Sequence, residues 1–319
     1  MMKKHLYKIL FANLLFVSLF SIAQEKDANT KVNTTQTSNI QTYTPSKLLS
    51  KGQWDVKFFN NLYIETKGVF NGVKSSKERE TYFTTSLEVF TGITDNNRVN
   101  IGLLLEYRSN TINGKGATSV FNFSNRKDAR NGLSSFAPAI KWQPIENVGN
   151  FSIQSAFHIP LIDQETKNGL KDENGTTIRD AVFLDQKGYT FQNRLFYDYT
   201  FPSRDWQIFT ELNTEYHFGD TSLTDNNGNT IKGSFANNTV VLAPGVFMSY
   251  FPSDTTTVLG FVQHFQRIGD FTQNFTALGF GGKYQLNQTL NLEVLYSKFV
   301  RGNETGLGQS FNIGLRALF

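Results

Sequence analysis

The chain of 319 residues contains no cysteine, and this absence excludes several classes of protein. Without a thiol there is no disulfide framework, and no lipid can be attached to a cysteine at a mature N-terminus. The fold must therefore be held together by noncovalent interactions alone.

The sequence also lacks an apolar run long enough to cross a bilayer as a helix. The run from Ile9 to Ile22 is shorter than the roughly 20 residues that a spanning helix needs. It follows three lysines, at positions 3, 4 and 8, and leads to Ala23, which is typical of a secretory signal peptide. We expect residues 1–23 to be cleaved; a single transmembrane helix is the alternative. The mean hydropathy of −0.34 excludes a bundle of spanning helices.

A strong excess of one charge is missing as well. The formal net charge is +4, and the lysines and arginines are scattered rather than clustered, which argues against a nucleic-acid partner. Aromatic residues, by contrast, make up 14% of the chain, with 30 phenylalanines. A chain that is polar on average and rich in aromatic residues suits a membrane-spanning β-barrel, which has a wet interior and aromatic girdles.

Residues 24–52 are mostly threonine, asparagine, glutamine, serine and lysine. This composition cannot bury enough apolar surface to offset the entropy of ordering, so we interpret the segment as a flexible periplasmic leader. Within it, Pro45 to Leu49 could form one helical turn that caps the periplasmic mouth or enters the lumen. A plain linker is the interpretation that we favour.

Residues 53–319 contain a repeated alternation of apolar with small or polar residues, which is the pattern of an outer-membrane β-barrel. Twelve strands are expected, an even number, as closure of bacterial single-chain barrels requires. They are predicted at 54–70, 80–92, 97–110, 133–143, 150–160, 188–202, 205–218, 238–252, 256–268, 271–285, 289–300 and 308–319.

The predicted connections alternate in length. Tight turns rich in Pro, Asn, Asp and Ser fall between alternate strands and are expected on the periplasmic side, with both termini. The longer segments, which would be extracellular loops, are 71–79, 109–132, 161–187, 219–237 and 301–307, with one short exception at 267–270.

The last strand distinguishes a membrane barrel from a soluble β-sandwich, which could share the same alternation. Its apolar face ends on the terminal residue of the chain and comprises Phe311, Ile313, Leu315 and Phe319, with Ala317 between. This pattern resembles the C-terminal signal by which bacterial outer-membrane barrels are recognised for assembly. The resemblance implies outer-membrane lipid and the barrel-assembly machinery as partners.

Two prolines and a glycine cluster interrupt the strand pattern. Pro138 and Pro244 each remove one donor from a strand that has no free edge, so we expect a local bulge at each. The cluster Gly279 to Lys283 lacks the spacing of a phosphate-binding loop, and we expect it to leave room in the lumen for a bulky neighbour or for the leader.

The signal sequence, the leader, the opening Lys51-Gly52-Gln53-Trp54-Asp55, the asparagine-rich loops and the terminal Phe319 together resemble outer-membrane β-barrels of the Bacteroidota. The likeness covers the whole mature barrel but is architectural. Some barrels of this kind belong to a small-solute transporter and porin-like group, so the resemblance implies transport without identifying a solute.

Function should lie on the strand faces opposite the apolar ones. Candidate lumen residues that could contact a solute are Glu106, Arg108, His158, Arg194, Glu211, Glu215, His217 and His264. Both signs of charge are present, whereas strong ion selection would require rings of one sign. Most of these side chains should lie near the extracellular mouth, where they form either a binding vestibule or an ordinary polar rim.

No pattern of metal, cofactor or catalytic residues stands out. The histidines come from separate strands without ligand spacing. Counting from Asp225 places Thr230 and Ala236 where a calcium loop needs Gly and Glu. The His-x-Ser spacing of outer-membrane phospholipases is missing, although a triad from distant strands stays open. We therefore expect no cofactor and no enzyme.

The sequence favours a twelve-stranded outer-membrane channel that passes small polar or amphipathic solutes by passive diffusion through a narrow, mixed-charge lumen. A barrel of that strand count leaves little open cross-section once side chains fill it. The alternative is a non-conducting structural or accessory barrel whose extracellular loops bind a partner protein or a glycan.

Overall fold

The computed structural model describes residues 45–126, 128–161, 170–171, 177–178, 184, 188–219, 222–224, 230–232 and 238–319. The expected signal peptide, most of the expected leader and residues 225–229 of the stretch tested as a calcium loop lie outside these residues. Among the described residues, no helix is long and apolar enough to span a membrane.

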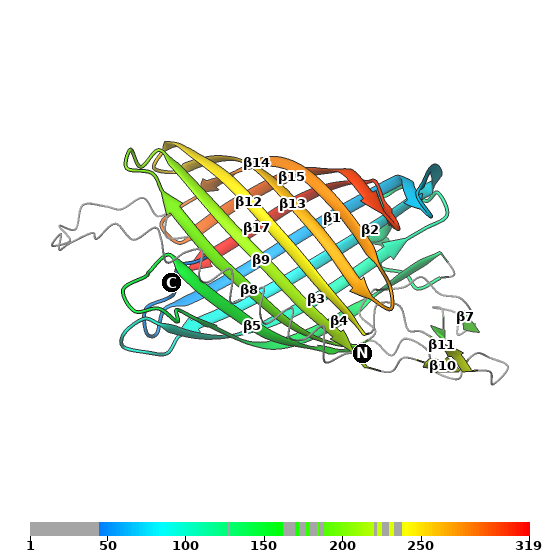
Figure 1. Ribbon diagram of the computed structural model, residues 1–319, viewed down its shortest axis with the longest axis horizontal. Helices are drawn as coiled ribbons and strands as arrows, with labels where there is room; N and C mark the ends of the chain where they lie inside the picture. The colour runs from blue at the N-terminus through cyan, green and yellow to red at the C-terminus, as the bar shows by residue number, and fades with distance from the viewer. Residues whose placement is uncertain are drawn as a thin grey trace. The chain divides into compact units, whose positions relative to one another are not determined.

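Twelve long antiparallel strands form one closed sheet (Figure 1). They are β1 (Trp54–Phe70), β2 (Val73–Gly92), β3 (Val99–Thr111), β4 (Ala129–Trp142), β5 (Phe151–Pro160), β8 (Tyr189–Thr200), β9 (Trp206–Phe218), β12 (Thr239–Ser253), β13 (Thr256–Gly269), β14 (Gln273–Gln285), β15 (Leu290–Asn303) and β17 (Gln309–Leu318). The remaining elements are short: η2 (Ala117–Asn122), β6 (Leu170–Lys171), β7 (Thr177–Ile178), β10 (Ser222–Thr224), β11 (Thr230–Lys232) and β16 (Thr305–Gly306).

The barrel closes because β1 pairs with both the second strand and the last. Asp55 lies opposite Leu318 of β17 and opposite Phe90 of β2, and the two ladders continue along β1. Each long strand thus has a partner on both sides, and no open edge is left. The predicted fold class, an all-β closed antiparallel barrel of twelve strands, is confirmed.

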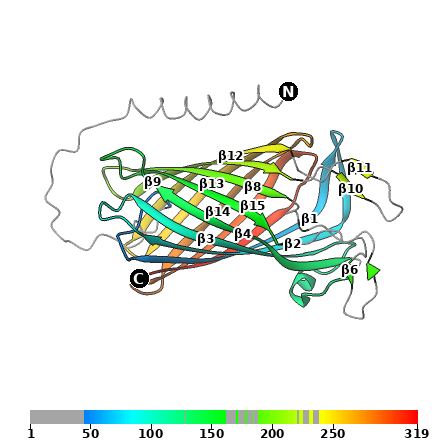
Figure 2. The ribbon, with the colours of Figure 1, turned by 90° about the horizontal axis from the view of Figure 1, so that it is seen from below.

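The two ends of the barrel differ. At the short-turn end, where Trp54 and Phe319 exchange backbone hydrogen bonds of 2.9 Å, the connections are 93–98, 143–150, 201–205, 254–255 and 286–289. At the opposite, long-loop end the longest connections are 112–128, 161–188 and 219–238. Figure 2 shows β6, β10 and β11 beyond the long-loop end of the strands.

Two predicted loops are wrong. In the predicted loop 301–307, β15 continues to Asn303, and Thr305–Gly306 form β16, which pairs with β1. Residues 71–79 were expected to form an extracellular loop, but β1 and β2 pair as far as Phe70 and Val73 around a two-residue turn. That turn is Asn71-Gly72, and both residues have positive φ, 50° and 74°. Asn-Gly is the favoured pair for such hairpin turns, so the charged residues 74–80 extend a strand.

The prediction of bulges at the two prolines is also wrong. The register of β12 with β9 and β13 is the same on both sides of Pro244, and that of β4 with β5 is the same on both sides of Pro138. Each proline instead interrupts the ladder on one side only, since it lacks a single donor. The irregularities lie elsewhere, for example between Glu65 and Lys67.

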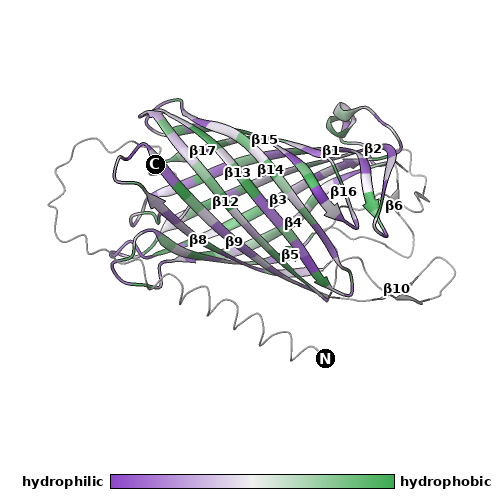
Figure 3. Ribbon diagram, turned by 45° about the horizontal axis from the view of Figure 1, so that its top comes forward, coloured by the Kyte–Doolittle hydropathy of each residue, from purple (hydrophilic) through white to green (hydrophobic). Residues whose placement is uncertain are grey.

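Hydrophobic and hydrophilic residues alternate along the long strands (Figure 3), and the exposed large hydrophobic side chains lie on the outside of the barrel. In β3, Ile101 and Leu103 are 46% and 48% exposed, whereas Asn100 is 2% exposed and faces inward. In β17, Phe311, Ile313 and Leu315 are exposed in the same way, as predicted. An apolar outer belt of this kind is typical of barrels that are solvated by lipid.

Aromatic residues border this belt at the short-turn end. Exposed Trp and Tyr side chains stand at or near the strand termini there: Trp54, Trp142, Tyr199, Trp206 and Tyr250. The rings of Trp206 and Tyr250 lie 4.7 Å apart on neighbouring strands. Amphipathic rings are enriched at the level of lipid headgroups, so this girdle indicates one membrane interface.

Candidate functional site in the barrel lumen

Among the described residues, two cavities lie within the lumen, and both are lined mainly by the inward faces of the strands. Cavity 1 has a volume of about 460 Å³ and extends to residues near the short-turn end, such as Ser249 and Thr257. Cavity 2, of about 550 Å³, lies towards the long-loop end, where its lining includes Phe271 and Glu304. Tyr63 lines both, so the two cavities adjoin within the barrel.

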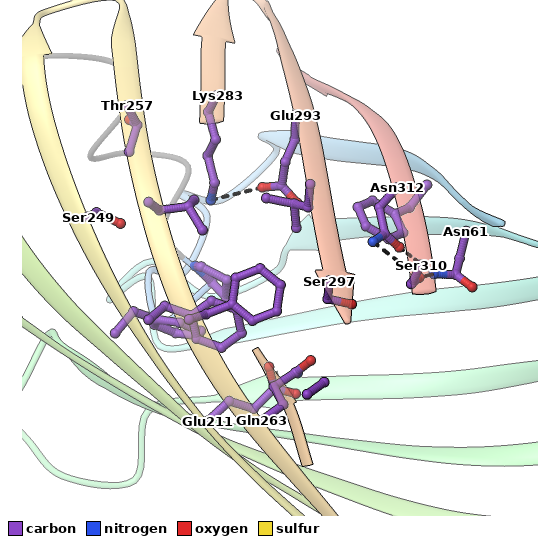
Figure 4. A pocket seen from close by; sticks show the side chains of 18 of the residues that line it. Asn61, Glu211, Ser249, Thr257, Gln263, Lys283, Glu293, Ser297, Ser310 and Asn312 are labelled. Atoms are coloured by element: carbon purple, nitrogen blue, oxygen red, sulfur yellow. Dashed lines mark hydrogen bonds and ion pairs between the residues drawn. The ribbon is translucent and has the colours of Figure 1, made fainter. Parts of the chain in front are cut away.

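Cavity 1 holds charges of both signs in equal number: Lys57, Arg194 and Lys283 against Glu88, Glu211 and Glu293. Lys283 pairs with Glu293 at 3.0 Å (Figure 4). Arg194 donates to Glu211 at 2.7 Å and also lies 3.8 Å from Glu88. Since β3, β4 and β5 lie between β2 and β8 in the sheet, the contact between Arg194 and Glu88 bridges the lumen.

Lys57 is arranged differently from the other two cations of cavity 1. Its ammonium lies 5.1 Å from the ring centre of Phe59, which is a cation–π contact. Around the remaining wall, Asn61 donates to Asn312 at 2.5 Å and also to Ser310. These polar groups lie near the Lys283–Glu293 pair in Figure 4.

Phenylalanines form the apolar wall of cavity 1. Phe209, Phe247 and Phe261 stand side by side on β9, β12 and β13, with successive ring centres 5.5 and 5.1 Å apart. A second row joins Phe275 and Phe299 at 4.0 Å. Sequence reasoning missed these inward aromatic residues, because it assigned aromatic side chains to lipid. The glycine cluster was the one signal in the sequence for an inward aromatic residue, because it was expected to leave room for a bulky neighbour. Phe261 is that neighbour: its ring would lie 2.2 Å from a Cβ at Gly279.

Cavity 2 has a hydrogen-bonded polar wall. Glu106 accepts from Arg108 at 2.8 Å and from Ser134 at 2.7 Å. Arg108 also donates at 3.2 Å to the backbone oxygen of Leu184, a fully buried residue of the 161–188 connection. The connection between β5 and β8 thus contacts the wall of the lumen.

The two histidines of cavity 2 are held by hydroxyl groups. Nδ1 of His217 lies 2.9 Å from Thr190 Oγ1, and its Nε2 lies 3.1 Å from Glu215 Oε2. Nδ1 of His158 lies 3.4 Å from Ser135 Oγ. In the described part of the chain, no group of three or more His, Asp or Glu residues could hold a metal ion.

The structure brings seven of the eight predicted lumen residues to the cavities. Arg194 and Glu211 line cavity 1, and the other five line cavity 2: Glu106, Arg108, His158, Glu215 and His217. Five of these seven thus gather towards the mouth at the long-loop end, where either a binding vestibule or an ordinary polar rim was expected. Their contact with a solute stays a prediction.

His264 is placed on the other face of its strand. The residues of β13 that line the cavities all have odd numbers, from Thr257 to Arg267, so His264 points outward with Val258 and Val262. Its Nδ1 lies 2.9 Å from Thr276 Oγ1. The assignment failed because Phe261 and Phe265 occupy the inward face, which reverses the expected alternation.

The end of the expected leader lies inside the barrel. We call residues 45–50 the inner segment. Lys141 donates to the backbone oxygens of Pro45 and Lys47, the latter at 3.1 Å, and Ser46 donates to Asp198. The sequence favoured a linker here over entry into the lumen, but local composition carries no information about these distant partners.

Comparison with known proteins identifies the fold. No family model matches the chain, and no curated protein matches it in sequence. An outer-membrane channel from Pseudomonas putida F1 superposes with a TM-score of 0.66 at 10% identity, over 86% of this chain and 98% of that one. The β domain of the Bordetella autotransporter BrkA gives 0.50 at 13% identity, over 83% and 98%. One of these proteins is a channel and the other is an autotransporter domain, and both share little sequence identity with this chain. The likeness therefore shows the barrel fold alone.

Proposed function

We propose that this protein is an outer-membrane channel that passes small polar or amphipathic solutes by passive diffusion. The observation that carries the proposal is the pair of adjoining cavities inside a closed barrel with an apolar outer belt. Such a barrel isolates a polar interior from lipid, and the interior then offers a path for solutes across the membrane.

The lining of cavity 1 limits the class of solute. Its charges are balanced and largely paired, so a strongly charged solute would gain little electrostatic attraction there, although it would lose its hydration. The phenylalanine wall favours a solute with an apolar ring or chain. We infer that neutral or zwitterionic amphipathic molecules fit best, at a size that a cavity of about 460 Å³ admits.

The orientation belongs to the same proposal. Short turns lie on the periplasmic side of bacterial barrels, so the short-turn end, with Trp54 and Phe319, would face the periplasm. The exposed apolar face of β17 would be read by the barrel-assembly machinery. Membership of a Bacteroidota group stays a prediction. No catalytic step, metal or cofactor is part of this proposal.

Swelling of proteoliposomes in isotonic solutes tests the proposal. Purified protein should accelerate swelling in small neutral or zwitterionic solutes over protein-free liposomes, with rates that fall as solute size rises. Equal swelling with and without protein, both for the wild type and for a variant with a loosened inner segment such as Leu49→Asp, would overturn it.

A non-conducting accessory barrel is the second candidate, and two observations favour it. The inner segment occupies the lumen near the short-turn end, and Leu184 is buried against the wall near the other end. If the lumen is closed permanently at both ends, the exposed parts of the long loops would carry the function. The swelling experiment separates the two candidates, because only the channel predicts solute entry.

A further inference from the structure

The inner segment is bound to the barrel wall by polar contacts with several strands. Besides the contacts of Lys141 on β4 and Asp198 on β8, the backbone N–H of Leu49 donates to Asn100 of β3 at 3.2 Å. Ser46 is fully buried, and Asp198 is held in turn by Gln207 at 3.3 Å. All these partners are inward-facing side chains, so the segment runs through the lumen.

An apolar contact adds to this attachment. Leu49 is 6% exposed and packs in a cluster with Phe90, Leu104, Ala137 and Ala156 from β2, β3, β4 and β5. The alanines leave the space that the leucine occupies. The barrel wall thus contains a pocket that fits one side chain of the inner segment.

Gly92 gives an independent sign that the wall is shaped around this segment. A Cβ at position 92 would lie 2.2 Å from the backbone oxygen of Ser50 and 2.6 Å from that of Leu49. Real Cβ atoms do not approach backbone oxygens so closely. The φ of Gly92 lies outside the left-handed region, so the backbone conformation itself does not require glycine. The glycine is required because the backbone of the inner segment approaches so closely.

The position of the segment relative to the cavities determines what it can do. Its contacts reach from β2 to β8, which are five adjacent strands of the twelve. Pro45, at its inner end, lines cavity 1. The inner segment therefore narrows the lumen beside cavity 1 at the short-turn end, on the side of β2 to β8.

We propose that the inner segment is a displaceable plug that restricts passage at the short-turn end of the lumen. This inference rests on the proposed function, because a plug regulates passage through the same cavities. The segment is attached by side chains and by one buried leucine rather than by strand pairing, and no covalent bond fixes it. It can therefore leave its site while the twelve-stranded ladder stays intact.

The test loosens the plug in two ways. Leu49→Asp places a charge in the apolar cluster, and Gly92→Ala puts a methyl group where the backbone of Ser50 lies. Leu48→Asp is the matched control, because Leu48 is the neighbouring leucine, is only half buried and lies outside the cluster. Heat-modifiable migration in gels identifies variants that form the barrel, and Gly92→Ala keeps the test valid should Leu49→Asp fail to fold.

The first readout is the accessibility of cavity 1. The chain has no cysteine, so Ser249→Cys, in cavity 1, can be labelled selectively with a bulky polar maleimide. Loosening the plug should raise its labelling rate by about fivefold or more, because the rate follows the population of the open state. A cysteine in cavity 2, Gln192→Cys, should label at an unchanged rate. Unchanged labelling of Ser249→Cys in both loosened variants would overturn the plug.

The second readout is solute flux in proteoliposomes, which separates the plug from the proposed function. Faster labelling and faster swelling in Leu49→Asp, with little change in Leu48→Asp, support both. Faster labelling without swelling in any variant keeps the plug and overturns the channel. Swelling that is equal in the wild type and both loosened variants, with unchanged labelling, keeps the channel and overturns the plug.

Discussion

The ion pairs of cavity 1 lead to a quantitative prediction about selectivity. Arg194 is the cation that contacts both Glu211, at 2.7 Å, and Glu88, at 3.8 Å. In the variant Arg194→Met the cavity keeps two cations, Lys57 and Lys283, against three carboxylates. The balanced lumen thus gains one net negative charge, and we expect it to become selective for cations.

The magnitude follows from Coulomb's law. A unit charge about 4 Å from a permeating ion contributes about 1 kcal/mol in water, with opposite sign for cation and anion. The difference of about 2 kcal/mol corresponds to roughly a 30-fold change in the cation-to-anion ratio, since about 1.4 kcal/mol is tenfold. Screening lowers this value, because the Debye length is about 10 Å at 0.1 M salt and about 3 Å at 1 M. We expect about tenfold at 0.1 M and much less at 1 M.

The assay is the reversal potential of the purified protein in planar bilayers under a potassium chloride gradient. The double variant Arg194→Met/Glu211→Gln restores the charge balance and should return the potential towards that of the wild type. Arg204→Met is the matched control, because Arg204 is an exposed residue of the β8–β9 connection and lines neither cavity. A reversal potential that does not change in Arg194→Met at 0.1 M, while the protein conducts, would refute the reasoning.

Three further predictions concern the wall of the barrel. Ile313→Arg, at a lipid-facing position in the middle of β17, should lower the free energy of unfolding in lipid by about 2–4 kcal/mol. Phe319→Arg, at the strand end, should lower it by about 1 kcal/mol or less. Urea titration followed by tryptophan fluorescence measures both values, and equal losses would contradict the lipid-facing assignment. Phe299→Ala removes a ring stacked at 4.0 Å on Phe275, so it should enlarge cavity 1 and admit larger solutes in the swelling assay; an unchanged size limit would argue against passage through cavity 1. His264→Ala should leave conductance unchanged, whereas His217→Ala, in cavity 2, should alter it, and the reverse order would contradict the placement of the two histidines.

Most of the fold could be predicted from the sequence because a barrel strand carries its own signal. Alternation with period two and clusters of turn residues act over a few positions, so the ranges for β3, β9 and β13 differ from the structure by at most a few residues. The hairpin at Asn71-Gly72 was missed, because the charged residues that follow it were taken for a loop although they extend β2.

The lining of the lumen could be predicted only in part. Charged residues such as Arg194 and Glu215 cannot face lipid, so their side of the strand was determined by their chemistry. Phenylalanine is tolerated on both faces, and the inward row of Phe209, Phe247 and Phe261 was therefore not predictable from alternation. His264 was misassigned for the same reason. The inner segment depends on partners about 50 to 150 residues away, such as Asn100 and Asp198, which no local pattern reveals.

The central claim is that small solutes cross the membrane through cavity 1, and a blocking experiment tests it most directly. Ser297→Cys points into cavity 1, whereas Val294→Cys, on the same strand, is 51% exposed on the outer face. Both would be coupled to a bulky maleimide before reconstitution, and swelling in a small neutral solute would be compared with that of the unlabelled proteins. We predict that the label at position 297 abolishes most of the protein-dependent swelling and that the label at position 294 leaves it unchanged. Swelling that is equally fast with cavity 1 filled would contradict the account.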